Sequence, residues 1–270
     1  MACVALALAL VLNRVGGGRA ESAPAAGLRV SVLDVGQGDA ILLQPAHAPA
    51  VLVDGGPPGD ELTAKLSAAG VKRLGIAVVT HEQADHAGGI GELLGRFPVD
   101  RLLYARLSRR LRGAAVAAGA TPVRIAEGDG VRSGELRLEV LWPPRVLLAE
   151  PPAGADPNAQ ALVLLARWRR FSMLLTADAE AEATPIDPGP VDVLKVAHHG
   201  SDDAGLDALL ERTYPRLAVI SVGAGNPFDH PTPDTLATLA AHGVPALRTD
   251  VDGTITLEAG KGSVSVSTSR

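Results

Sequence analysis

Short apolar runs separated by glycine- and proline-rich turns recur along the chain from residue 28 onward. Runs of about four to eight apolar or β-branched residues between such turns predict strands, whereas apolar positions that repeat every three or four residues predict helices. The first half follows this pattern, with strands expected at 28–33, 40–43, 51–53, 74–79, 102–104, 122–125 and 136–141, and helices at 60–69, 87–96 and 107–118.

A proline-rich segment at 143–157 leads to a second half with the same alternation. It predicts strands at 161–166, 172–176, 193–196 and 217–222, a terminal hairpin around Asp252-Gly253, and helices at 205–212 and 232–242. Two similar halves of mixed strands and helices predict an α+β fold, in which two sheets pack face to face with helices outside them. Histidines and carboxylates that could bind a ligand follow predicted strands in both halves. We therefore expect the functional site in a cleft along one edge of this four-layer αββα sandwich.

The chain starts with an apolar stretch, residues 2–12, followed by a polar, glycine-containing linker that ends at Gly27. The stretch is shorter than the ~20 apolar residues that cross a bilayer comfortably, and it lacks the preceding positive charge of a typical signal peptide. It is interpreted as a signal peptide, a short membrane segment, or the end of a membrane helix that is missing upstream or lies on another chain. All three interpretations predict an extracytoplasmic or membrane-associated location. Residues 1–27 are then an N-terminal apolar segment and linker, and residues 28–270 are the folded domain.

Composition narrows the class of protein. With 47% hydrophobic and only 3% aromatic residues, the chain has material for a large core built from Ala, Val and Leu. Cys3 is the only cysteine, which excludes internal disulfides and a thiolate zinc site.

The net charge of −5 argues against a strongly basic nucleic-acid binder, although arginines cluster twice. The clusters are either solvated surface or nucleic-acid contacts, and both interpretations stay open. One comprises Arg101, Arg106, Arg109, Arg110 and Arg112, and the other Arg167, Arg169 and Arg170 around Trp168.

Five of the seven histidines lie in three short loops, at 80–86, 198–201 and 229–231. The first loop follows the strand-like run 76–79 and precedes a glycine pair and a predicted helix, so its side chains should project from the end of a sheet. It carries His81, Asp85 and His86, and imidazoles beside a carboxylate suit zinc, manganese or iron. The loop therefore predicts a shared metal site, whereas His47 and His242 are interpreted as ordinary histidines, either solvated at the surface or satisfied in the core.

The letters THEQADHAGG at 80–89 resemble the motif of the metallo-β-lactamase fold superfamily, whose usual form is His-x-His-x-Asp-His. Further segments, LDVGQGDA at 33–40, VDGG at 53–56, LTADAE at 175–180, VAHHGS at 196–201 and NPFDHP at 226–231, are similar to the C-terminal domain of the ComEC family of DNA-uptake channel proteins. This resemblance covers about residues 28–258. It implies an αββα sandwich of the metallo-β-lactamase type.

In the ComEC family this domain follows a membrane channel and is thought to be a metal-dependent nuclease that degrades the non-transported strand of incoming DNA. The chain resembles only the hydrolase part. We therefore expect a detached domain, a split gene product or a free-standing relative with another substrate. DNA is the favoured substrate, and a membrane channel is a candidate partner.

The resemblance also implies a ligand set. Asp85, His86 and His198 would hold one ion, Asp178 would bridge, and His81 would begin the other position.

Two positions depart from the pattern, because Gln83 stands where the family has its second histidine and Asn158 where a further histidine is often found. Amide oxygens are neutral, weak ligands beside imidazole or carboxylate. We expect one firm divalent ion, zinc or manganese, and a second that is weak, substrate-assisted or absent.

The implied chemistry is hydrolysis by a water bound to the metal. Asp85 would orient or deprotonate that water, and His199 or His230 would donate to the substrate oxygen or leaving group. Asp54 would fix a ligand histidine from behind, as outer carboxylates do.

Other polar residues nearby have weaker interpretations. Asp34, Gln37 and Asp39 either shape a tight glycine-marked turn or contribute to the catalytic edge. Ser201 lacks the Gly-x-Ser-x-Gly elbow of a serine nucleophile, and the glycine run 16–18 has no strand before it, so no nucleotide cofactor is predicted.

Three functions remain open. A phosphodiesterase or nuclease associated with DNA uptake, or competence, predicts that the arginine clusters line the cleft. A hydrolase of a small phosphoester, choline ester or lactone predicts a deep pocket with little basic surface. A metal-deficient, non-catalytic DNA-binding or assembly module is kept because of Gln83 and Asn158, whereas a true β-lactamase is disfavoured by the DVGQGD and HHGS segments.

Overall fold

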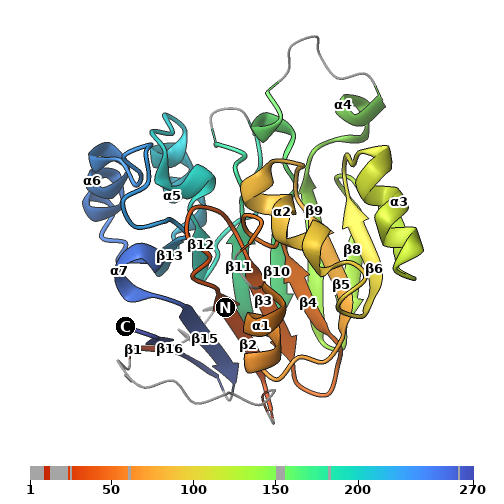
Figure 1. Cartoon of the computed structure of the whole chain (residues 1–270). Coiled ribbons are helices and arrows are strands. Elements are labelled where there is room, and N and C mark those ends of the chain that lie inside the picture. The colour runs from red at the N-terminus through yellow and green to blue at the C-terminus, as the bar shows by residue number, and fades with distance from the viewer. Residues whose placement is uncertain are drawn as a thin grey trace, which may run out of the picture.

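Two β-sheets lie face to face in the computed structural model, which describes residues 9–12, 24, 26–59, 62–149, 156–181, 184–260 and 262–270 (Figure 1). Within these residues the first sheet has nine strands, ordered β1-β16-β15-β2-β3-β4-β5-β6-β7. Their bounds are β1 Ala9–Leu12, β2 Leu28–Val32, β3 Ile41–Pro45, β4 Ala50–Val53, β5 Leu74–Val79, β6 Val99–Tyr104, β7 Thr121–Arg124, β15 Ile255–Gly260 and β16 Ser263–Thr268.

The second sheet has seven strands in the described residues, ordered β14-β13-β12-β11-β10-β9-β8. Their bounds are β8 Gly130–Ser133, β9 Leu136–Trp142, β10 Val163–Trp168, β11 Phe171–Leu175, β12 Val193–Lys195, β13 Leu217–Ile220 and β14 Ala246–Arg248. Aliphatic side chains of both sheets fill the space between them, including Val30 and Leu43 from the first sheet and Leu164 and Met173 from the second.

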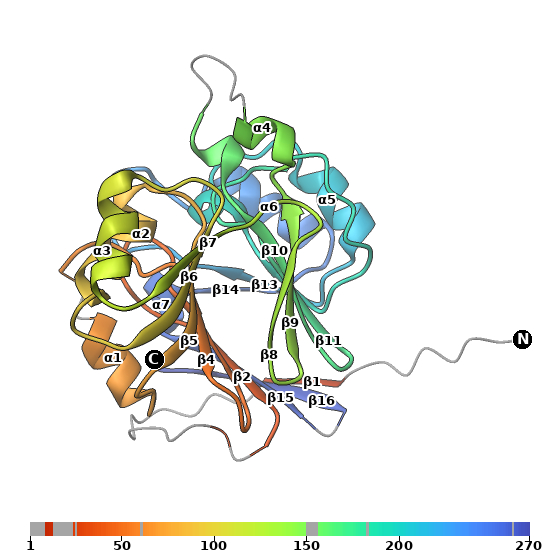
Figure 2. The same ribbon diagram turned by 90° about the vertical axis from the view of Figure 1, so that its right-hand side faces the viewer.

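Helices cover the outer faces of the two sheets, as the second view shows (Figure 2). The first sheet carries α1 (Leu62–Ala68), α2 (Ala84–Leu93) and α3 (Arg109–Ala117) over one apolar cluster. The second sheet carries α5 (Leu206–Thr213) and α6 (Pro233–Ala241) over another. The expected four-layer αββα sandwich is therefore confirmed.

Complete burial of β5 follows from this layering. All six of its residues are buried, because the facing sheet covers one side of the strand and helices cover the other. Its run Leu-Gly-Ile-Ala-Val-Val is accordingly apolar throughout and does not alternate, as expected of a strand covered on both faces.

The prediction of the C-terminal turn was wrong. Thr249–Asp252 form a short helix, α7, and Gly253, at φ +70°, ends it. The hairpin lies further on, where β15 and β16 pair antiparallel. Asp-Gly is a strong hairpin signal, but here the glycine takes its positive φ at a helix C-terminus, which glycine also favours.

The proline-rich segment holds a short helix, α4 (Arg145–Ala149), which the pattern did not predict. Strands β8 and β14, of four and three residues, were also not predicted. Both lie at edges of the second sheet and are too short to show a clear alternation.

Part of the N-terminal apolar stretch forms β1, which pairs parallel with β16 at the edge of the first sheet. The rest of the stretch and most of the linker, residues 1–8, 13–23 and 25, lie outside the described residues. In the part of the chain that the structure describes, no helix combines the length and apolar character needed to cross a bilayer. The division of the chain at residue 27 stays a prediction.

Candidate metal centre

The polar loops meet at one edge of the sandwich because of strand direction. Strands β4 and β5 are parallel neighbours in the first sheet, and β11 and β12 are parallel neighbours in the second. Their carboxyl ends therefore deliver successive loops to the same edge, where α/β sheets commonly place ligand sites. These loops carry Asp54, the 80–86 segment, Asp178 and the His198-His199 pair.

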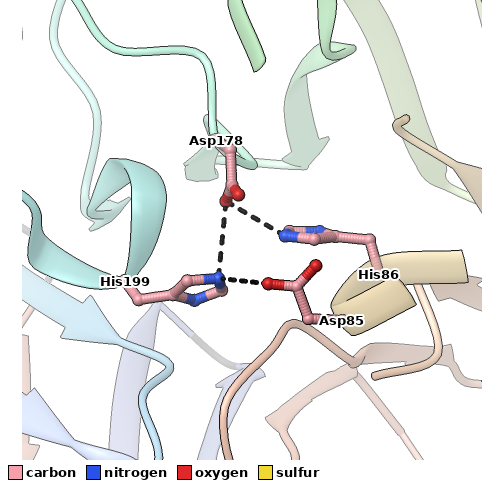
Figure 3. A group of neighbouring side chains, drawn as sticks. All are labelled: Asp85, His86, Asp178 and His199. Atoms are coloured by element: carbon pink, nitrogen blue, oxygen red, sulfur yellow. Dashed lines mark ion pairs between the residues drawn. The ribbon is translucent and has the colours of Figure 1, made fainter. Parts of the chain in front are cut away.

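Four side chains converge at this edge: Asp85, His86, Asp178 and His199 (Figure 3). Asp178 Oδ1 lies 3.1 Å from His86 Nε2 and 3.7 Å from His199 Nε2, and His199 Nε2 lies 3.4 Å from Asp85 Oδ2. One ligand atom from each residue falls within 4.8 Å of all the others. Ligand atoms that share one ion, each about 2.1 Å from it, are separated by roughly 3.0 to 4.2 Å.

Four polar atoms of this group are buried and have no hydrogen-bond partner. His86 Nε2, His199 Nε2 and both carboxylate oxygens of Asp178 are in this state. Leaving one buried polar atom unsatisfied costs about 1–3 kcal/mol, so four around one point need a common explanation. The donor set of two imidazoles and two carboxylates fits a divalent cation such as zinc or manganese.

In His86 and His199 the ring nitrogen that faces away from the group of four, Nδ1, donates a hydrogen bond. His86 Nδ1 donates to Asp54 Oδ2 (2.8 Å), and His199 Nδ1 donates to the backbone oxygen of Ser221 (2.8 Å). A neutral imidazole with its proton on Nδ1 presents a lone pair on Nε2, the state that binds metal. Asp54 is itself held by the backbone N–H and hydroxyl of Thr80, at 2.8 and 2.6 Å.

Asp178 and the histidines around it shift one another's pKa values. Burial alone would raise the pKa of this carboxyl, but the charges of His86 and His199 outweigh it and hold the pKa well below its usual value. Burial alone would likewise lower the pKa of His86, but Asp178 and then Asp54 raise it well above its usual value. A divalent ion at this point must therefore displace the proton that these carboxylates favour on His86.

The two neighbouring histidines occupy different places from those predicted. His198 was expected to join Asp85 and His86, but it is His199 that lies beside them. His198 instead places Nδ1 2.9 Å from Glu180 Oε1 and Nε2 4.0 Å from the other oxygen of Asp178. Since the Nε2 of His199 faces two carboxylates, the geometry fits a ligand there better than the expected proton donor.

The left-handed backbone conformation of His198 and His199 explains why His199, and not His198, lies beside Asp85 and His86. His198 and His199 have φ of 47° and 56°, a region that non-glycine residues rarely adopt. Consecutive residues in this conformation turn their side chains to different sides of Asp178. Strained backbone of this kind often marks a functional site.

Of the residues expected at the second, weaker metal position, His81 lies beside the second oxygen of Asp178. His81 Nε2 lies 3.7 Å from Asp178 Oδ2 and 3.0 Å from Gln83 Oε1. Asn158 Nδ2 lies 3.4 Å from His198 Nε2. Burial, followed by the charge of His86, lowers the pKa of His81, so its imidazole is neutral.

His230 lies next to this region without joining the group of four. Its ring is 5.7 Å from that of His198, and its Nδ1 is buried without a hydrogen-bond partner. Asn226 holds the loop by donating to the backbone oxygen of His230 (2.7 Å) and accepting from its N–H (3.1 Å). Burial, then nearby His198, lowers the pKa of His230.

Lys195 and Glu180 were missed in the sequence. Lys195 is fully buried, forms an ion pair with Asp39, and donates 2.9 Å to the backbone oxygen of Ala177. Asp39 Oδ1 in turn lies 3.6 Å from His199 Nδ1, so this residue lies behind the metal ligands. The signal was present, because a lysine inside an otherwise apolar strand is rarely buried unless it is paired.

Asp34 and Gln37 have structural contacts. Asp34 forms an ion pair with Arg270 at 2.6 Å, and Gln37 Oε1 accepts from the backbone N–H of Gly223 at 3.1 Å. Of the three polar residues in the DVGQGD segment, Asp39 alone contacts a residue of the group of four through its side chain in the described structure.

The two arginine clusters differ in their position. Arg169 and Arg170 form the turn between β10 and β11, at the end of β11 opposite to Asp178, and Arg169 stacks on Trp168. Arg110 of α3 lines a cavity of about 630 Å³ that Gln83 also lines. Arg110 of the first cluster therefore lines a cavity next to Gln83, whereas Arg169 and Arg170 lie at the opposite end of β11 from Asp178.

Replacing Asp54 by asparagine is expected to weaken binding of the first metal equivalent by about 10- to 100-fold, the usual effect of losing an outer carboxylate. The charge that fixes the His86 proton on Nδ1 is lost, while the shape of the side chain is kept. Calorimetric titration of the metal-free chain with Mn²⁺ measures the change. An unchanged affinity would show that Asp54 only supports the fold.

Residues 33–224 match the Metallo-beta-lactamase superfamily, and the chain belongs to this superfamily. Its curated relatives are competence proteins of the ComEC family. ComE operon protein 3 of Bacillus subtilis is 31% identical over 256 residues, which cover 84% of this chain and 32% of that protein. Competence protein ComA of Neisseria gonorrhoeae is 30% identical, over 91% of this chain and 34% of its own length. The chain thus spans about a third of these relatives.

Solved structures agree on the fold. The metallo-beta-lactamase fold protein YhfI from Bacillus subtilis superposes with a TM-score of 0.62 at 12% identity, over 86% of this chain and 100% of that one. A diphosphatase from the PhnP family superposes with a TM-score of 0.55 at 14% identity, over 86% and 98%. At these identities the likeness concerns the fold alone.

Proposed function

We propose that this chain is a metal-dependent phosphodiesterase that cleaves DNA, with Asp85, His86, Asp178 and His199 as the ligands of its first metal ion. The observation that carries the proposal is the set of four buried, unpartnered ligand atoms on His86, Asp178 and His199. Similarity to competence proteins supports DNA as the substrate and a role in DNA uptake. The same relatives support a membrane channel as partner and a membrane-associated, extracytoplasmic location.

The side chains around the centre have separable tasks. A bound divalent ion would acidify water and neutralise charge on a phosphoryl oxygen. Asp85 has 32% of its side chain exposed, whereas His199 and Asp178 have 2% and 1%. Asp85 is therefore the ligand placed to orient the attacking water toward the substrate.

His230 and Arg110 lie where a substrate would approach. His230 has an unpartnered Nδ1 near the rings of the site, and this atom would form a hydrogen bond with the leaving oxygen. Arg110 lines the cavity next to Gln83, where a phosphate of the DNA backbone would be bound by its guanidinium group.

The test is hydrolysis of single-stranded DNA, double-stranded DNA and bis-p-nitrophenyl phosphate by the full chain with added Mn²⁺ or Zn²⁺. We expect metal-dependent cleavage, with Asp85→Ala reducing the rate by at least about 10²-fold because several kcal/mol of charge stabilisation depend on the ion. His242→Ala, a change in a surface pair with Asp207, should leave the rate unchanged.

Other outcomes contradict the proposal in different ways. Cleavage of the small ester without cleavage of DNA would indicate a small-molecule hydrolase. Absence of cleavage with either metal would favour a non-catalytic DNA-binding or assembly module, the function that the neutral ligands Gln83 and Asn158 would explain.

A further inference from the structure

One phenylalanine is exposed at the edge of the sandwich that holds the metal centre. Of the three phenylalanines in the chain, Phe97 and Phe171 are buried in the apolar clusters, at 8% and 2% exposure. Phe228 is 60% exposed and lies in the loop that follows β13. Strands β12 and β13 are parallel neighbours, so this loop leaves the same edge as the one that carries His198 and His199.

Ring contacts connect Phe228 to the metal centre. Its ring centroid lies 5.8 Å from that of His230, and the His230 ring lies 5.7 Å from that of His198. His198 Nε2 in turn lies 4.0 Å from Asp178 Oδ2. A base attached next to a phosphate at the metal centre would therefore pass only two imidazole rings to reach Phe228.

The loop that carries Phe228 is held by one asparagine. Asn226 Oδ1 accepts from the backbone N–H groups of Phe228 and His230, both at 3.1 Å. Asn226 Nδ2 donates to the backbone oxygens of Gly223 and His230, at 3.0 and 2.7 Å. Because these hydrogen bonds already order the loop, little loop entropy remains to be lost when a ligand packs on the exposed ring.

Charge favours a base over a phosphate as the group that packs on this ring. Asp229, the next residue, is exposed, and the segment 223–232 contains no lysine or arginine. A carboxylate repels the oxygens of a phosphate. The face of an uncharged base, by contrast, stacks on an aromatic ring without needing a positive charge nearby.

We infer that Phe228 is the platform on which the base of an unpaired nucleotide stacks while the adjoining phosphate lies at the metal centre. The inference rests on the proposed function and adds a residue that holds the strand. A base inside a duplex has both faces covered by its neighbours, whereas bases of single strands are free to stack on aromatic side chains. Phe228 thus favours a strand that is unpaired where it is cleaved.

Binding of two single strands to the full chain tests the inference. One is a fluorescein-labelled deoxythymidine strand of about ten nucleotides, and the other has the same length but abasic sugars, so it keeps the phosphates and lacks the bases. Fluorescence anisotropy is measured with Ca²⁺ in place of Mn²⁺, and the strands are checked for integrity afterwards. Phe228→Ala should weaken binding of the deoxythymidine strand by about 5- to 150-fold, the effect of losing one base–aromatic stack. Binding of the abasic strand should not change.

Two further variants separate stacking from other effects. Phe228→Trp keeps an aromatic face and should bind the deoxythymidine strand at least as tightly as the unaltered chain does. Tyr214→Ala removes a ring that is 71% exposed before the start of β13, at the end opposite to the metal centre. It should bind both strands as the unaltered chain does.

The outcomes distinguish this inference from the proposed function. Unchanged binding of the deoxythymidine strand by Phe228→Ala, or an equal loss for both strands, would overturn the stacking role and leave the proposed function standing. Binding that depends on Phe228 without hydrolysis of any substrate in Mn²⁺ or Zn²⁺ would sink the proposed function and support the stacking role. Absence of binding to either strand would contradict both.

Discussion

Replacing Asp178 by asparagine is expected to reduce metal-dependent hydrolysis by on the order of 10³-fold or more, because the ion contributes several kcal/mol to the transition state. This carboxylate faces His86 and His199 through one oxygen and His81 and His198 through the other. An amide of the same shape keeps the packing but removes the negative charge. The metal centre therefore loses one of its charged ligands.

Stability against unfolding gives a readout of this variant that needs no substrate. Mn²⁺ at 100 times its dissociation constant should stabilise the unaltered chain by about 2.7 kcal/mol, and the Asp178→Asn chain should gain nothing at the same concentration. Asp207→Asn, which changes an exposed carboxylate paired with His242, is the matched control and should keep the full gain. An Asp178→Asn chain that is stabilised as much as the unaltered chain would exclude Asp178 as a ligand.

Replacing Lys195 by methionine is expected to lower the free energy of unfolding by about 3–5 kcal/mol, the usual cost of removing one partner of a buried ion pair. Lys195 is fully buried, so its loss leaves Asp39 charged and uncompensated in the interior. The carbonyl oxygen of Ala177, one residue before Asp178, also loses one of its two donors and keeps the backbone N–H of His198. Denaturant unfolding of the metal-free chain measures the effect.

A double variant separates the ion pair from simple packing. Asp39→Asn in the Lys195→Met background removes the stranded charge and should recover part of the lost stability. If the two single changes add without any recovery, the ion pair does not account for the loss, and a packing defect around Lys195 does.

Much of the fold was predictable because its strands and helices are bounded by glycine- and proline-rich turns. The buried run of β5 was predicted at its observed bounds, Leu74–Val79. The Asp252-Gly253 turn was assigned to the wrong element because a glycine at positive φ serves a hairpin and a helix end equally well. Edge strands as short as β14 carry too few residues for a pattern to be detected.

At the site, sequence spacing predicted the loops but not the direction of each side chain. His198 and His199 are adjacent in the chain, and only their left-handed backbone decides which one faces Asp85 and His86. The pairing of Lys195 with Asp39 joins strand β12 to a turn more than a hundred residues earlier, which no local pattern reveals. The contact of Asp54 with His86, by contrast, agrees with its expected place behind a ligand histidine.

Anomalous diffraction from crystals of the full chain grown with Mn²⁺ or Zn²⁺ tests the central claim most directly. We expect a strong peak within about 2.3 Å of His86 Nε2, His199 Nε2, an oxygen of Asp85 and Oδ1 of Asp178. Absence of a peak among these atoms at millimolar metal, or a peak held by other residues, would contradict the metal centre and with it the proposed hydrolase function.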